Sequence, residues 1–333
     1  MTVIALDVGG TEIKGAVVAD DGTPLRSERW LTRSDRGPGA VIDTVLGCAT
    51  DLADLARHAD TPLRAAGIVV PGVVDERTGT VRRAVNLDWH DVPIRPWLAE
   101  HLGLPVAFGH DVRAGGLAEA RLGAGRGSDS FLFVPVGTGI AAAVLHGGRA
   151  VTGALGAAGE LGHLVVRPDG ERCACGNRGC LETVASASAV ARRYARLTDR
   201  PTATAEDVHR GLGDGEAAAV RIWAEAVHAL ADGLAAATTL LDPERIVLGG
   251  GLARAGEDLL GPLRRALADR LTFRSAPRLV RAELGHRAGC LGAALLALDL
   301  AADVAAAADP ASDVAASDAS ETAGSVATPG GAR

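Results

Sequence analysis

Residues 159–182 read GELGHLVVRPDGERCACGNRGCLE and hold three of the five cysteines in the chain. With one histidine they form the pattern H-x9-C-x-C-x4-C, made by His163, Cys173, Cys175 and Cys180. One imidazole and three thiolates complete a tetrahedral set for zinc, and four protein ligands leave no open position for water, as in structural zinc sites. The spacing therefore favours structural zinc over the alternatives, which are a loop of free thiols and a disulfide.

Two carboxylates, Glu160 and Glu182, bracket this loop. A closed site of three cysteines and one histidine needs no further ligand. We therefore interpret the two glutamates as polar groups that the metal loop directs toward something else.

The composition limits the class of protein. The chain has 333 residues, enough to bury one large core or, more readily, two. It is 47% hydrophobic but only 3% aromatic, so its cores should consist of small, closely packed residues. The net charge of −7 argues against a nucleic-acid partner, which would favour a basic face.

The sequence shows neither a membrane span nor a secretory signal. No apolar run reaches the length of a span, and the N-terminal MTVIALDVGG lacks a basic segment. The few cysteines lie mostly in one metal-like cluster, which fits a reducing compartment. We expect a cytoplasmic protein that contacts no membrane.

One basic residue differs from all the others. Of the 34 lysines and arginines, Lys14 is the only lysine. An ammonium is a compact point charge, whereas a guanidinium is a broad planar fork. Such a strong bias toward arginine indicates that position 14 requires the ammonium. The alternative, an accidental lysine, is disfavoured by the motif around it.

That motif is a glycine-rich hairpin. Strands are expected at 3–8, 15–19 and 24–31, with Asp7-Val-Gly-Gly-Thr11 at the first turn. Because a strand follows, this is neither a Walker A loop nor a dinucleotide fingerprint, both of which need a helix. The backbone N–H groups of Gly9, Gly10 and Thr11 can form a nest for phosphate oxygens, and Asp7 can hold magnesium through water. An ordinary hairpin with an acidic strand end remains an equal alternative.

A second acidic residue ends another strand. A helix is expected at 38–59, strands at 65–70 and 105–108, and a helix at 114–122. Pro71-Gly72 ends one strand, and Asn86-Leu-Asp-Trp89 is expected in the loop beyond it. Asp111 follows the strand at 105–108, at the edge where open α/β sheets bind ligands. Asp is also a favoured helix N-cap, which is the structural alternative.

A second hairpin repeats the pattern of the first. Strands expected at 130–136 and 140–146 flank Gly137-Thr138-Gly139. Two such hairpins suggest a duplicated architecture with a nucleotide between its halves. A strand at 245–248 ends in Gly249-Gly250-Gly251, which permits either a flat ring such as adenine on the backbone or a tight turn.

The rest of the chain is expected to be largely helical, apart from a short strand at 278–281. The remaining helices are expected at 180–197, 205–212, 216–241, 256–270 and 288–300. From about Ala301 the sequence has no aromatic residue, leucine or isoleucine, so residues 301–333 should be a disordered tail.

Taken together, these motifs resemble the ROK family of sugar kinases and related repressors, and the resemblance covers residues 1 to about 300. The matching motifs are Asp7-x-Gly-Gly-Thr-x-x-Lys14, Pro71-Gly72-x-x-Asp75, Asn86-Leu-x-Trp89, Gly137-Thr-Gly139, Gly159-Glu-Leu-Gly-His163, Cys173-x-Cys175-Gly-x-x-Gly-Cys180-x-Glu182 and Gly249-Gly-Gly251. The resemblance implies an actin-like, ribonuclease-H-like ATPase fold with two α/β domains closing over sugar and ATP, and a homodimer. We place a small N-terminal domain at 1–112, joined by the helix at 288–300, and a large domain with the zinc loop at 113–287.

The resemblance also implies a role for each motif residue. Asp111 would be the general base that takes the proton of the attacking hydroxyl. ATP and Mg²⁺ would be held by Asp7, Gly9, Gly10, Thr11, Lys14, Gly137, Thr138, Gly139, Gly249, Gly250 and Gly251. The sugar would contact Gly72, Asn86, His110, Asp111, Glu160, His163 and Glu182, with His163 also on zinc.

Two positions depart from the family pattern. The family usually has Asn-Asp-x-Asn around the base, where this chain has His110-Asp111-Val112-Arg113, and it has more glycines where this chain has 141–143 as alanines. The sequence predicts an ATP-dependent hexokinase acting on glucose. The alternatives are an N-acetylhexosamine kinase and a non-catalytic sugar-binding regulator. A DNA-binding repressor is disfavoured, because only six residues precede Asp7.

Overall fold

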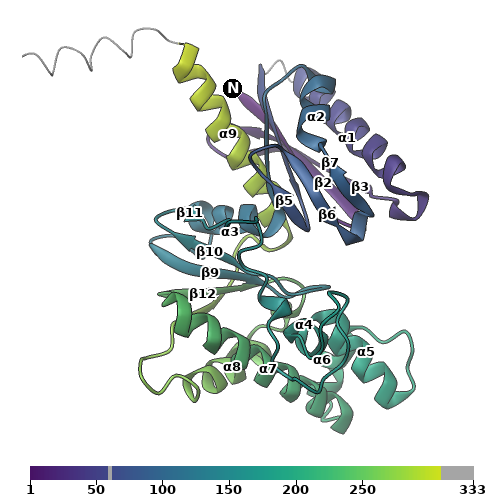
Figure 1. Cartoon of the computed structure of the whole chain (residues 1–333), viewed down its shortest axis with the longest axis vertical. Helices are drawn as coiled ribbons and strands as arrows, with labels where there is room; N and C mark the ends of the chain where they lie inside the picture. The colour runs from purple at the N-terminus through teal and green to yellow at the C-terminus, as the bar shows by residue number, and fades with distance from the viewer. Residues whose placement is uncertain (59–61, 309–333) are drawn as a thin grey trace, which may run out of the picture.

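The computed structural model describes residues 1–58 and 62–308. In this part of the chain two five-stranded sheets have the same strand order. One lies in the upper half of Figure 1 and the other below it. The first sheet runs β3 (Pro24–Leu31), β2 (Glu12–Ala19), β1 (Thr2–Val8), β4 (Leu63–Val70) and β8 (Val106–His110). The second runs β11 (Arg149–Ala150), β10 (Ala143–His146), β9 (Ser130–Pro135), β12 (Arg245–Gly249) and β13 (Arg278–Arg281).

The strand directions also agree between the sheets. In the first sheet β2 pairs antiparallel with β1 and β3, while β4 pairs parallel with β1 and β8. In the second sheet β10 pairs antiparallel with β9 and β11, while β12 pairs parallel with β9 and β13. The duplicated architecture predicted from the two hairpins is therefore present. It also places the two glycine hairpins at equivalent strand ends.

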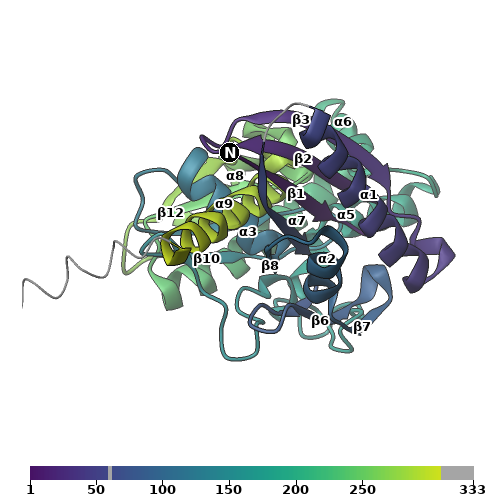
Figure 2. The same cartoon turned by 90° about the horizontal axis from the view of Figure 1, so that it is seen from above.

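Two helices fill the space between the sheets. α9 (Ala288–Ala308) packs on β1 and β4 of the first sheet, while α3 (Asp111–Leu122) packs on β9 and β10 of the second and against α9. Along β1, Ile4 and Leu6 pack in the cluster with α1 (Pro38–His58), whereas Val3 and Ala5 pack in the cluster with α9. Figure 2 shows α1 and α9 on either side of β1. The alanines of α9 allow the close packing expected of a chain with few aromatics, and Gly67 has no room for a side chain against Ala293.

The end of α9 corrects two expectations. The helix continues to Ala308, so the predicted disorder is wrong for residues 301–308; alanine is the best helix former, and Ala301 is buried. Residues 309–333 lie outside the described part. The expectation that no apolar run reaches a span length is also wrong, because Gly285–Ala308 does by length and composition. Its buried face packs on the first sheet, as a core helix does.

The second sheet has a larger helical cover on its other face. Leu132, Val134 and Ile246 pack in one core with these helices, which lie in the lower part of Figure 1. The cover comprises α4 (Leu181–Ala185), α5 (Ala187–Thr198), α6 (Ala205–Gly213), α7 (Ala217–Leu241) and α8 (Glu257–Ala268). The single helix expected at 180–197 is broken at Ser186, whose hydroxyl accepts the Ala189 N–H at 3.1 Å and caps α5.

The structure contains a small third sheet that the sequence pattern does not predict. It consists of β5 (Val73–Asp75), β6 (Thr80–Ala84) and β7 (Trp89–Val92), and α2 (Ile94–Leu102) follows it. The segment predicted as a loop around Asn86 is instead a 3-10 turn, Val85–Leu87, followed by β7. Trp89 is fully buried and donates its indole N–H to the Pro38 carbonyl at 3.2 Å. β10 is shorter than predicted, because the Ala142 N–H donates to Gly159 instead of a strand partner.

A buried carboxylate joins the two central helices. Glu119 of α3 has no exposed surface, and its oxygens accept the N–H groups of Ala124 at 2.8 Å and Leu284 at 2.9 Å. The segment around Leu284 leads into α9. Glu119 therefore ties the end of α3 to the start of α9.

We expect Glu119→Ala to lower the free energy of unfolding by about 3 kcal/mol or more, because it leaves buried N–H groups without acceptors. Urea denaturation measures the change. Glu283→Ala is the control, since the side chain of this exposed glutamate pairs with an exposed arginine, Arg126, and the substitution keeps the Glu283 backbone N–H that donates to Glu119. A loss in Glu119→Ala no larger than in Glu283→Ala would contradict the prediction.

Candidate active site and metal centre

The first glycine hairpin connects β1 to β2. The Gly9 N–H donates to the Glu12 carbonyl at 2.9 Å and closes the turn. The carbonyls of Gly9 and Gly10 accept the hydroxyls of Thr32 at 2.6 Å and Ser34 at 3.1 Å. These contacts hold the carbonyl oxygens of the turn to the segment after β3. A turn held in this way suits a phosphate nest, which needs N–H groups rather than carbonyls to face the anion.

Asp7 and Lys14 are opposite each other on β1 and β2, with 3.3 Å between Oδ2 and Nζ. Burial raises the pKa of Asp7 to about 6, although Lys14 opposes the shift. The start of α9 crowds the same carboxylate, because a side chain at Gly289 would lie 2.6 Å from Oδ2. A buried carboxylate that is only partly neutralised suits a hard divalent cation such as Mg²⁺, which prefers oxygen ligands.

Asn86 and Gly72 lie next to this hairpin and its neighbouring strand. A side chain at Gly10 would lie 2.9 Å from Cβ of Asn86, so Gly10 has to be glycine for the two segments to meet. Gly72 has a φ of +96° and sits against the backbone of Ala84. The structure therefore brings the predicted sugar residues of this half beside the predicted phosphate residues.

Asp111 is the first residue of α3. The N-cap is its neighbour His110, whose Nδ1 accepts the Val112 N–H at 3.2 Å, and Asp111 Oδ1 accepts the same N–H at 2.7 Å. His110 thus holds the N-cap position, while Asp111 also accepts a first-turn N–H, so the structural role weighed for Asp111 is present beside any catalytic one. Burial raises the pKa of Asp111 and lowers that of His110 to about 4, so His110 is neutral near pH 7. The Asp111 side chain is still 29% exposed, which leaves it accessible to a ligand.

Arg113 makes contacts that the sequence did not predict. Its guanidinium donates to Glu76 Oε1 from Nε at 3.0 Å and Nη2 at 2.8 Å, and to the Gly156 carbonyl from Nη1 at 3.0 Å. Arg113 is only 4% exposed. Glu76 was missed because nothing in its hairpin sequence marks it. The departure of Arg113 from the family pattern was the available signal.

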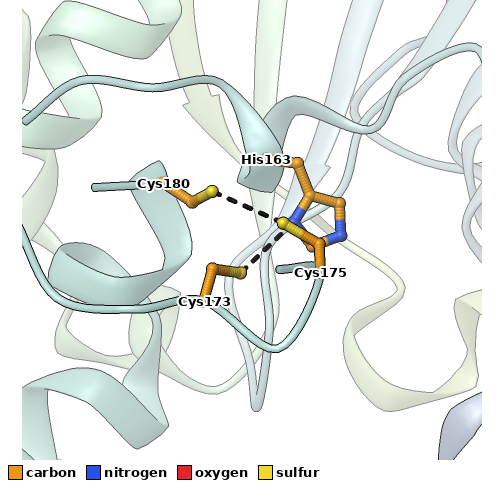
Figure 3. Close-up of side chains that lie close together, drawn as sticks. All are labelled: His163, Cys173, Cys175 and Cys180. Carbon is orange, nitrogen blue, oxygen red and sulfur yellow. Dashed lines mark hydrogen bonds between the residues drawn. The ribbon is translucent and has the colours of Figure 1, made fainter. Parts of the chain in front are cut away.

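The four predicted metal ligands lie together, with their ligand atoms within 4.8 Å of one another. Figure 3 shows the side chains pointing toward one another. His163 Nδ1 is 3.6 Å from Cys173 Sγ, and Cys175 Sγ is 3.7 Å from Cys180 Sγ. Tetrahedral zinc with bonds of about 2.3 Å holds its sulfurs roughly 3.7 Å apart, so the donor set fits zinc. All five cysteines are free thiols, and the disulfide alternative is not present.

The two bracketing glutamates flank His163. Glu160 Oε2 is 3.8 Å from Nε2, and Glu182 Oε1 is 3.6 Å from Nδ1. Glu182 also approaches the second glycine hairpin, since a side chain at Gly139 would lie 3.1 Å from its Oε2. Glu182 thus lies between the Gly137–Gly139 turn and the metal cluster, because its Oε1 is also 3.1 Å from Cys173 Sγ. The expectation that the glutamates are directed away from the metal is therefore not met for Glu182.

The third glycine turn packs against the second hairpin. Val136, just before Gly137, donates its N–H to the Gly249 carbonyl and accepts the Leu252 N–H, both at 3.0 Å. Gly250 has a φ of +80° and leaves no room for a side chain against Val136, so it serves a tight turn. Gly251 faces open space and lines a cavity of about 550 Å³ that also includes His209 and Arg254.

Comparisons with known proteins agree with this architecture. The model of the ROK family matches residues 3–300. A glucokinase from Thermotoga maritima is 36% identical over 311 residues, covering 88% of this chain and 96% of that enzyme. A ROK hexokinase from Thermus thermophilus superposes with a TM-score of 0.80 at 37% identity, covering 91% of this chain and 100% of that one.

A third relative was solved with ligands. The ROK glucokinase from Streptomyces griseus, in complex with glucose and AMPPNP, has a TM-score of 0.78 at 30% identity and covers 89% of this chain and 99% of that one. The actin-like ATPase fold that the sequence motifs implied is confirmed. The chain belongs to the ROK family.

Proposed function

We propose that this protein is an ATP-dependent glucose kinase that transfers the γ-phosphoryl group of ATP to a glucose hydroxyl, giving glucose 6-phosphate. The observation that carries the proposal is the position of Asp111, a half-buried and accessible carboxylate at the start of α3, close enough to Asp7 and Lys14 for their charges to interact. The glucokinase relatives support the choice of glucose.

Each residue has a defined task in this reaction. Asp111 accepts the proton of the attacking hydroxyl, and its raised pKa makes it a better base than an ordinary aspartate. Lys14 and the N–H groups of the hairpins at Gly9–Thr11 and Gly137–Gly139 hold the phosphates. Positioning and charge neutralisation dominate phosphoryl transfer, so this set of groups is sufficient.

The sugar would lie between the two halves of the site. Asn86 and Gly72 contact it from the first half, and Glu160, Glu182 and Nε2 of His163 from the second. His110 flanks the base and presents a neutral ring. The cavity lined by Gly251 is our candidate for the adenine side.

Two metals belong to the proposal. Asp7 would hold Mg²⁺, which neutralises phosphate charge when bound. His163 Nδ1 and the three clustered cysteines would hold structural zinc, which leaves Nε2 for the sugar. The boundaries at 112 and 287, the homodimer, the cytoplasmic location and the absence of a nucleic-acid partner stay predictions.

A coupled ADP-release assay over a panel of hexoses tests the function. We expect glucose to give the highest kcat/KM, with Mg²⁺ required. A higher value for an N-acetylhexosamine would favour that alternative substrate. Sugar binding by calorimetry without ADP release for any hexose would favour the non-catalytic regulator.

The single lysine gives a second test. We expect Lys14→Arg to lower kcat roughly 10-fold or more, although it keeps the charge, because even about 1 Å of misplacement in a reacting complex is costly. Steady-state kinetics with ATP measures this. The control is Arg29→Lys, which makes the reverse change directly across the strand pair, at an exposed side chain paired with Glu12. Equal kinetics in both variants would mean that the lysine is accidental.

A further inference from the structure

Arg113 joins three segments that the proposed function places around the sugar. It lies two residues after the base, on α3. Glu76, its ion-pair partner, lies in the turn between β5 and β6, which follows Gly72. Gly156, whose carbonyl it binds, lies in the loop that leads to Glu160. One buried guanidinium thus connects the helix of the base with a segment from each half of the site.

Both partners of Arg113 are held in place. Arg95 of α2 donates to the backbone carbonyls of Glu76 at 3.1 Å and Arg77 at 2.9 Å, which anchors the hairpin turn. Gly156 has a φ of +71° and packs so closely on the Val74 carbonyl that no side chain fits there. The ion pair therefore connects two anchored segments and not two mobile side chains.

Apart from the ion pair, the loop meets the hairpin where Gly156 packs on the Val74 carbonyl of β5. Cavities of about 610 Å³ and 540 Å³ flank the ion pair, and Arg113, Glu76 and Thr152 line both. Because hollow space lies on both sides, the hydrogen bonds of Arg113 act at a point where the hairpin and the loop are otherwise loosely packed. A planar guanidinium with three directed hydrogen bonds is suited to this task, and a lysine or an asparagine cannot make all three.

We propose that Arg113 is a positioning residue that keeps the hairpin of Glu76 and the loop of Gly156 assembled around the sugar, so that it sets sugar affinity rather than the rate of phosphoryl transfer. This inference rests on the proposed function. The apparent affinity for a ligand falls in proportion to the population of the binding-competent arrangement. Saturating sugar restores that arrangement, so kcat is preserved.

The test compares substitutions on the same helix. We expect Arg113→Ala to raise the KM for glucose about 10-fold with kcat changed less than about 3-fold, and Arg113→Lys and Glu76→Gln to give smaller increases. In Arg113→Ala, a further Glu76→Ala change should add little. The control is Arg121→Ala, since this arginine lines one of the same cavities but pairs at 2.7 Å with Asp299 of α9 and not with Glu76.

The outcomes separate the two proposals. A KM increase in Arg113→Ala no larger than in Arg121→Ala, or a fall in kcat at unchanged KM, would overturn the role of Arg113. If Arg113→Ala does not fold, the KM values of Glu76→Gln and Arg113→Lys decide in the same way. If the wild type phosphorylates no hexose, the proposed function fails. The role of Arg113 is then tested by measuring the glucose affinity of each variant by calorimetry. We expect the affinity to fall in the Arg113 and Glu76 variants and to stay at the wild-type value in Arg121→Ala.

Discussion

Asp111→Asn should lower kcat by roughly 10²–10⁴-fold while the fold and the sugar affinity stay close to those of the wild type. The amide cannot accept a proton from the attacking hydroxyl. It can still accept the Val112 N–H that Asp111 binds at 2.7 Å, so the start of α3 keeps its contacts. The N-cap is His110 and is unchanged by the substitution. Coupled kinetics at saturating glucose and ATP measures the loss.

The control for Asp111→Asn is Glu257→Gln, which removes a first-turn carboxylate from α8 at an exposed position. We expect wild-type turnover in the control, because a first-turn acid that only stabilises its helix has no part in the reaction. Burial raises the pKa of Asp7 to about 6, so both it and Asp111 can contribute to a fall in rate at acid pH. The substitution therefore identifies the base, whereas a pH profile alone does not. Wild-type turnover in Asp111→Asn would refute the assignment.

The sequence predicts those features whose signal lies within one short stretch of residues. The two glycine hairpins could be located because Gly-Thr turns between buried strands have a specific pattern, and the metal ligands because their spacing brings four donors together. The structure brings residues of the two motifs together, because Glu182 of the metal loop lies beside Gly139 of the second hairpin.

Other features depend on contacts between distant segments. The strands of the small sheet are three to five residues long and carry charged residues, so they lack a periodic signal. α9 was predicted too short because alanine appears in disordered tails as well as in helices, and its length follows from packing on the first sheet. The pairing of Arg113 with Glu76 joins residues 37 positions apart and has no local signature.

Removing the metal from the Cys3His cluster should abolish sugar binding together with activity. His163, Cys173, Cys175 and Cys180 come from a loop with little core of its own, in which Cys175 is exposed and several neighbouring residues are exposed too. Ion pairs attach the loop to the helices, as between Arg167 and Asp232 at 2.7 Å, and backbone hydrogen bonds close its turns, as from the Gly170 N–H to the Arg167 carbonyl at 2.8 Å. These contacts do not hold the four ligand side chains to one another. A metal bound by all four side chains would, and its binding energy becomes folding energy of the loop.

We expect purified protein to contain about one zinc per chain, and Cys173→Ser to lose both the zinc and at least 10²-fold in kcat/KM. The loop positions Glu160, His163 and Glu182. Each hydrogen bond to a charged group contributes roughly 1.5–3 kcal/mol, so losing two of them costs about 10²–10⁴-fold. Cys48→Ala is the control, because this buried thiol belongs to α1, in the core of the first half and away from the cluster. It should keep its zinc and its activity.

The same experiment separates zinc from a redox role for these cysteines. A chelator should inactivate the enzyme and added zinc should restore it, whereas a reducing agent alone should have no effect, since Cys175 and Cys180 are unbonded at 3.7 Å. Asp111→Asn and Cys173→Ser then differ in kind: the first keeps glucose binding by calorimetry and the second loses it. Zinc-free protein that binds glucose like the wild type would show that the loop folds without a metal.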